Sequence, residues 1–130
     1  IPEKGWNTSD SKEIEKVGKE KIESLKKEIA EVGNLIKERE QLSQRIIDEA
    51  EKVKIEVNNF LVEHKPVDSD ALKESIALKQ KQVEVSELQL KEKVSCWQDV
   101  AKLKQELREC EKELADRESR LKMLDKILEE

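Results

Sequence analysis

His64, Cys96 and Cys110 are the residues of this chain, beyond its many carboxylates, whose side chains could carry chemistry. His64 stands beside Pro66, where a solvent-exposed role at the end of a helix explains it better than catalysis. The sequence contains no CxxC pair, no HExxH and no glycine-rich phosphate loop. We therefore expect no enzymatic activity, no cofactor, no metal ion and no small-molecule substrate.

The two cysteines are separated by about 21 Å along a helix, at about 1.5 Å per residue, so they cannot form a disulfide within it. A disulfide between chains would require two copies aligned in parallel. On an apolar seam, Cys110 would behave as a small apolar residue. Two unpaired cysteines are typical of a reducing compartment, so we expect an intracellular protein, cytoplasmic rather than nuclear.

The composition indicates long helices rather than a globular core. Of the 130 residues 44% are charged and only 2% aromatic, but the apolar residues recur at steps of three and four. Charges of both signs alternate around a net charge of −5, without the wide basic face that nucleic acids need. No apolar run approaches the roughly 20 residues of a membrane span. The chain begins at Ile1 without a methionine, and we expect it to be a fragment of a longer protein.

Pro66 lies near the midpoint of the chain, between two long stretches with apolar residues at helical spacing. Because proline interrupts helices, this predicts an all-α fold, a long antiparallel helical hairpin or coiled coil. We predict a lead-in over residues 1–10, a first helix over 11–65, a turn over 66–69 and a second helix over 70–130. The alternative is a single rod kinked at Pro66.

A heptad pattern predicts the seam, meaning the positions of each helix that face the other helix. In the first helix the heptad pattern is interrupted by Arg39 and Ser43. Leu35 and Leu42, one position to the side, partly compensate for this break. The predicted seam residues are Ile22, Leu25, Ile29, Val32, Ile36, Ile46, Val53, Val57 and Phe60 in the first helix, and Ile76, Val83, Leu90, Trp97, Leu107, Leu114, Leu121 and Leu124 in the second.

The seam of the second helix has two registers that join only if one residue is lost near Trp97, a local overwinding of the stammer type. Folding at Pro66 pairs residues whose numbers sum to about 133, which places Trp97 opposite Ile36. We therefore predict that Gly33 makes room for the Trp97 ring. Near the other end of the hairpin, Trp6 is expected to pack close to Ile127 and Leu128, or to remain unpacked.

A second apolar stripe near the turn predicts a binding surface, because a helix with a wide apolar face normally packs against more than one neighbour. Its residues are Ile47, Ile55 and Val62 in the first helix, and Leu78, Val85 and Leu88 in the second. The hairpin would then complete a three- or four-helix bundle with a protein partner or with a second copy as a homodimer.

No motif of the sequence selects a known family. The pattern favours a non-enzymatic coiled-coil module of an intracellular scaffold or multisubunit complex, whether cytoskeletal, trafficking or chromosome-associated. The alternative is a passive spacer that holds flanking domains about 80 Å apart, at about 1.5 Å per residue.

Overall fold

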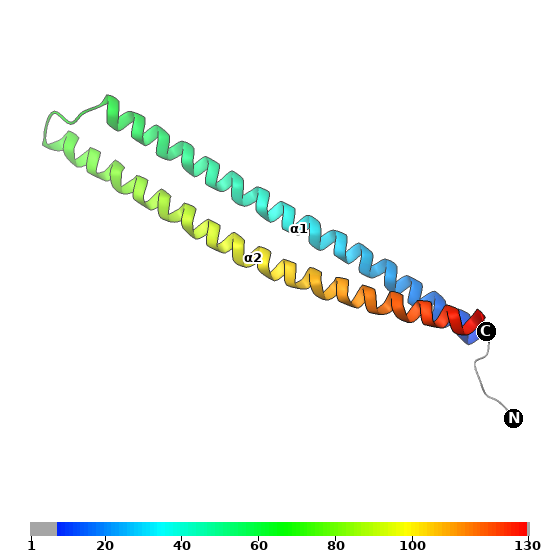
Figure 1. Ribbon diagram of the computed structural model, residues 1–130. Helices are drawn as coiled ribbons and strands as arrows, with labels where there is room; N and C mark the ends of the chain where they lie inside the picture. Colours follow the sequence, from blue (N-terminus) through cyan, green and yellow to red (C-terminus); the bar gives the residue numbers. More distant parts are fainter. Residues whose placement is uncertain (1–7, 130) are drawn as a thin grey trace. The chain divides into compact units, whose positions relative to one another are not determined.

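The structure is a computed structural model that describes residues 8–129. Within that range it consists of two helices, α1 (Thr8–Glu63) and α2 (Ser69–Glu129), and contains no strand. The helices pack antiparallel as a hairpin, which confirms the predicted fold class and excludes the kinked rod (Figure 1). Helix α1 begins at Thr8, earlier than the predicted residue 11. Trp6 and its predicted packing lie outside the described residues.

Local hydrogen bonds define the turn at both helix ends. The carboxylate of Asp68 accepts a hydrogen bond from the backbone N–H of Ala71 at 2.8 Å, which caps the start of α2. At the end of α1, the N–H of His64 donates to the carbonyl of Phe60 at 2.8 Å, and the two rings stack with centroids 4.3 Å apart. Pro66 lies in the short link between the two caps.

The hairpin divides into two compact parts. One part, here called the terminal part, consists of the described residues up to Ile36 and from Lys102 onward. The other, the turn part, is the segment Lys37–Ala101. Each helix contributes to both parts.

An apolar seam holds the terminal part together. Ile22, Leu25, Val32 and Ile36 are its buried α1 residues. The half-buried members are Ile29 in α1 and Leu103, Leu107, Cys110, Leu114, Leu121 and Leu124 in α2.

In the terminal part, each α1 residue lies opposite an α2 residue that is closer to the C-terminus than the predicted one. A methyl group on Gly18 would lie 3.6 Å from Cδ1 of Leu121, whereas the predicted pairing placed Ala115 there. Side chains lean toward the N-terminus of their own helix, so in an antiparallel pair they meet partners further from the turn than the backbone positions indicate.

In the turn part, the α1 seam departs from the heptad pattern after Ala50. An additional four-residue step leads from Ala50 to Lys54, which is half-buried, and the seam then continues through Val57 and Leu61. The predicted seam positions Val53 and Phe60 are therefore wrong: these side chains are 39% and 40% exposed.

The α2 seam in the turn part also differs from the prediction. Its half-buried or buried positions are Ala71, Ser75, Leu78, Gln82, Val85, Gln89, Glu92, Cys96 and Val100. The predicted seam residues Ile76, Val83, Leu90 and Trp97 are exposed instead. An additional four-residue step from Cys96 to Val100 joins this seam to Leu103, and such a step locally underwinds the pattern. The predicted stammer, which would overwind it, is therefore wrong.

The predicted role of Gly33 is contradicted as well. No atom of a neighbouring segment lies within 4 Å of the position that a methyl group would take on this glycine. Trp97, its predicted neighbour, is 73% exposed. Gly33 therefore faces open space and accommodates no large side chain.

Candidate partner-binding surface

Six exposed apolar side chains line one face of α2 in the turn part. We call this set the α2 stripe, and it consists of Leu72, Ile76, Val83, Leu90, Val94 and Trp97. Their exposed fractions range from 49% for Ile76 to 73% for Trp97. Because successive residues of a helix are rotated by about 100°, these six positions fall within about 60° of one another. The stripe extends over more than three heptads, with Lys79 and Ser86 between its apolar members.

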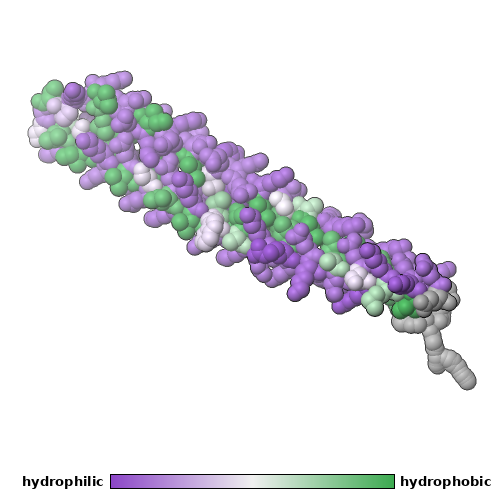
Figure 2. Space-filling view, in the orientation of Figure 1, coloured by the Kyte–Doolittle hydropathy of each residue, from purple (hydrophilic) through white to green (hydrophobic). Residues whose placement is uncertain are grey.

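The α2 stripe is separate from the seam. By the same helical geometry, the seam residues Leu78, Val85 and Gln89 lie about 120° around α2 from the stripe. Helix α2 therefore has two faces in the turn part, one packed on α1 and one open to solvent. Figure 2 shows apolar residues among hydrophilic ones on the visible surface of this part.

Arg39 holds the two helices together at a seam position where a coiled coil usually has an apolar residue. Its guanidinium donates to the carboxylate of Glu92 at 2.8 Å and to that of Asp99 at 2.9 Å, and a longer contact of 3.4 Å reaches Ser95. These hydrogen bonds raise the pKa of Arg39 above its usual range. The hydrogen bond from Arg39 lowers the pKa of Glu92, with a smaller contribution from buried Ser43. Both groups therefore stay ionised at neutral pH.

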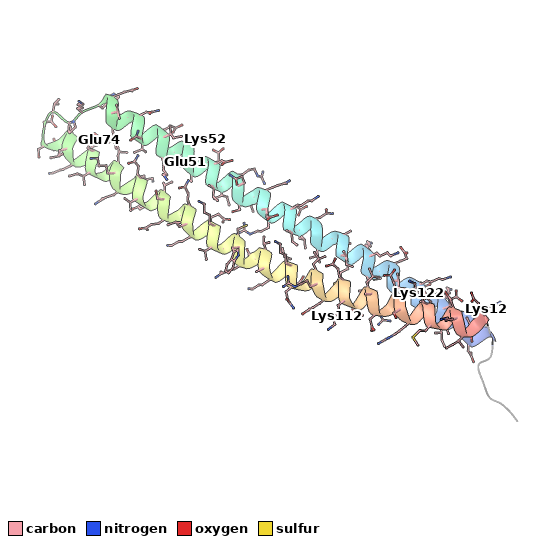
Figure 3. All side chains as sticks on the ribbon, viewed as in Figure 1. Lys12, Glu51, Lys52, Glu74, Lys112 and Lys122 are labelled. Carbon is pink, nitrogen blue, oxygen red and sulfur yellow. The ribbon has the colours of Figure 1, made fainter. Side chains whose placement is uncertain are left out.

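A second polar layer surrounds Gln89, which is buried. Its amide nitrogen donates to the carbonyl of Ile47 at 3.1 Å, and its oxygen accepts a hydrogen bond from the Lys54 ammonium at 3.0 Å. Gln82 donates to the carbonyl of Lys54 at 3.2 Å. Figure 3 shows Glu51 on the side of α1 nearer to α2, where its carboxylate lies 3.5 Å from the Gln89 amide.

These polar layers explain why sequence reasoning assigned the α2 residues wrongly. A search for apolar heptads selects Ile76, Val83, Leu90 and Trp97, but the face that packs on α1 carries Gln82, Gln89 and Glu92 because α1 presents Lys54 and Arg39 to it. One available signal was that Lys79, Ser86 and Lys93 interrupt the apolar heptad on α2. Lysines at such positions are unusual in the seam of a two-helix hairpin.

The residues predicted to bind a partner divide into two groups. Ile47, Leu78 and Val85 are half-buried, and Leu78 and Val85 follow the α2 seam. Ile55, Val62 and Leu88 are exposed, at 53%, 66% and 53%. The main exposed apolar surface of α2 is therefore the α2 stripe and not the predicted positions Leu78 and Val85.

An open apolar groove also runs along one flank of the turn part. Leu42, Ile46 and Val53 line it from α1, and Val85 and Leu88 line it from α2. Lys81, Arg45 and Glu49 border it. In the terminal part, a comparable groove lies among Ile14, Val17, Gly18, Leu121 and Leu124, with Arg117 and Arg120 beside it. Each groove follows the seam within its own part of the hairpin.

Cys96 and Cys110 are both unpaired and half-buried. Desolvation and the neighbouring carboxylate of Glu28 raise the pKa of the Cys110 thiol, which therefore stays protonated at neutral pH. Within residues 8–129 no group of three or more histidine, cysteine, aspartate and glutamate side chains is arranged to hold a metal ion. In the same range, neither helix contains an apolar stretch of the kind that spans a bilayer.

Comparison of the chain with protein-family models, curated proteins and solved structures gives no significant match.

Proposed function

We propose that this chain is a non-enzymatic protein-interaction module whose turn part binds a partner helix along the α2 stripe. The observation that supports the proposal is the row of six exposed apolar side chains, from Leu72 to Trp97, on one face of α2. Scattered exposed apolar residues are normal on protein surfaces, but a row of them at heptad spacing along one helix face is typical of helix-to-helix packing. Such a module fits an intracellular scaffold or a multisubunit complex.

The energetic scale agrees with reversible binding. Covering a large apolar side chain contributes about 1.5–3 kcal/mol at most, whereas association costs about 4–15 kcal/mol in lost freedom. Six such side chains are enough to offset that cost when the partner matches their spacing. Trp97, the most exposed of the six, would be the strongest single contact, because tryptophan is enriched among residues that dominate interfaces.

The test is photo-crosslinking in cells with a photoreactive residue in place of Val83 or Leu90. We expect adducts with a distinct partner from both positions, since both side chains are exposed on the α2 stripe. The control places the same residue at Gln41 or Asn59, which are exposed polar positions of α1. A passive spacer would give the same products from all four positions, or none.

A second arm uses charge. The double variant Val83→Asp/Leu90→Asp should lose the partner while its thermal unfolding stays close to that of the wild type. Its control, Gln41→Glu/Asn59→Asp, adds the same two negative charges with nearly unchanged side-chain shape. If both double variants retain the partner equally, the α2 stripe is not the binding surface.

A further inference from the structure

The turn part has a second apolar row, which lies on α1. We call it the α1 row, and it consists of Leu42, Ile46, Val53 and Phe60. These four positions fall within about 40° of one another around the helix. Ile46 is half-buried and the other three are exposed. The first three line the apolar groove on the flank of the turn part, and Phe60 continues the row toward the turn.

The α1 row and the α2 stripe lie on different sides of the turn part. Val85 and Leu88, which line the groove from α2, lie about 140–160° around that helix from Val83 of the stripe. Because α2 itself lies between the groove and the stripe, one partner helix cannot cover both. The turn part can therefore contact two neighbouring molecules at once.

The two apolar surfaces match in spacing. The α1 row advances by steps of four, seven and seven residues. The α2 stripe advances by the same steps from Leu72 through Ile76 and Val83 to Leu90, and also when it is read backward from Val94 to Ile76. Helices whose apolar residues share a spacing can interdigitate their side chains along their length. The stripe of one copy therefore has the spacing that the α1 row of another copy requires.

The charges around the two surfaces are opposite in sign. The exposed charged residues of the turn part within about 100° of the α1 row are four glutamates and two basic residues, namely Glu38, Glu49, Glu56, Glu63, Arg45 and Lys52. Within the same angle of the α2 stripe they are four lysines and two glutamates, namely Lys73, Lys79, Lys91, Lys93, Glu84 and Glu87. The formal charge is therefore −2 around the α1 row and +2 around the stripe.

These charges favour one pairing over the others. Two stripes placed face to face would bring like charges together, and so would two α1 rows. A stripe placed on an α1 row brings opposite charges together, which favours this pairing and disfavours the alternatives. Lys81 on the α2 edge of the groove changes this little, because Glu84 lies three positions away from it.

We infer that a second copy of this chain occupies the α2 stripe and binds it through its own α1 row. This inference rests on the proposed function, because it names the partner of the stripe. The contact uses a different surface on each copy, so an assembly always has a free stripe at one end and a free α1 row at the other unless it closes into a ring. Since the two surfaces face different sides, two copies cannot exchange both contacts, and association continues beyond a dimer.

Analytical ultracentrifugation of the full chain at increasing concentration tests the inference. The stripe variant is Val83→Asp/Leu90→Asp, and the groove variant is Leu42→Asp/Val53→Asp. We expect the wild type to form species larger than a dimer as its concentration rises, and each variant alone to stay monomeric. An equimolar mixture of the two variants should form a dimer with one copy of each and grow no further. In that mixture one variant supplies an intact α1 row and the other an intact stripe.

Two controls accompany the variants. Gln41→Glu/Asn59→Asp adds two negative charges to exposed polar positions of α1 and should assemble at least as well as the wild type. Circular dichroism establishes that each variant is folded. If the aspartates unfold the groove variant, Leu42→Gln/Val53→Thr takes its place, because it keeps the side chains close to their original size.

The outcomes distinguish the inference from the proposed function. A wild type that stays monomeric up to about 1 mM, a wild type that stops at a dimer, or a mixture of variants that stays monomeric would overturn the inference. If Val83 and Leu90 then crosslink to a different protein in cells, the proposed function stands without it. If the stripe variant assembles as the wild type does, the inference fails, and if that variant also keeps its partner in cells, the proposed function fails with it.

Discussion

Arg39 and Glu92 show how charged residues serve in a helical seam. The Arg39 side chain is only 18% exposed and that of Glu92 15%. Arg39 donates hydrogen bonds to the carboxylates of Glu92 and Asp99. A buried ion pair is weak evidence of added stability, but a polar layer in a coiled coil restricts register. We interpret this pair as the feature that aligns the two helices of the turn part.

The lowered pKa of Glu92 predicts a specific pH dependence. The folded-state pKa lies below that of the unfolded chain, so the carboxylate stabilises the fold above about pH 4.3. This contribution is lost as the pH falls through the folded-state pKa. We expect Glu92→Gln to lower the melting temperature at pH 7, with a difference from the wild type that shrinks as the pH falls below about 4.3 and is lost below the folded-state pKa. Thermal melts against pH measure this, and exposed Glu84→Gln should show no such convergence.

Gly33 is a residue where the structure predicts a gain of stability. Alanine stabilises a helix interior by about 0.5–1 kcal/mol relative to glycine, and open space surrounds this position. Gly33→Ala should therefore raise the free energy of unfolding by roughly that amount in urea denaturation. Gly18→Ala is a close comparison, because its methyl group would make an ordinary contact with Leu121. A loss of stability in Gly33→Ala would mean that a large neighbour does occupy the site.

At the scale of the helices, Val83 and Val85 allow the two faces of α2 to be compared, because one valine lies on each face. Val85 is half-buried on the seam and lines the flank groove, whereas Val83 is 59% exposed on the α2 stripe. We expect Val85→Ala to cost about 1 kcal/mol, since it removes two partly buried carbon atoms. Val83→Ala should stay within about 0.5 kcal/mol of the wild type.

Denaturant unfolding of both valine variants measures the difference directly. The same substitution at two positions of one helix keeps the change in helix propensity constant, so the comparison reports burial alone. Equal losses of stability would contradict the division of α2 into a packed face and an open face.

At the scale of the whole molecule, the two parts differ in the chemistry of their seams. The buried residues of the terminal part are four aliphatic residues of α1 and one polar residue, Ser11, whereas those of the turn part are Ser43 and Gln89 beside Ala50 and Val100. Apolar burial stabilises more than the exchange of hydrogen bonds with water does. The turn part is therefore expected to open more readily, as suits a segment that binds a partner.

Amide hydrogen exchange tests this difference. Amides around residues 22–36 should exchange more slowly than those around residues 72–97, and binding of a partner helix should slow exchange in the second range. Slower exchange in the turn part of the free protein would contradict the expected order.

The sequence by itself determined the fold class, because two long apolar periodicities around Pro66 leave few alternatives to a helical hairpin. It also predicted apolar seam residues of the terminal part, such as Leu25 and Leu121, which are buried and half-buried in the structure. Only the tertiary structure decided the seam of the turn part. There, Arg39 and Lys54 on α1 select Glu92 and Gln89 on α2, a choice that depends on pairs of residues far apart in the chain. A periodicity counted along one helix cannot contain that information. The exposure of the α2 stripe therefore follows only from the tertiary structure, in which the other, more polar face of α2 packs on α1.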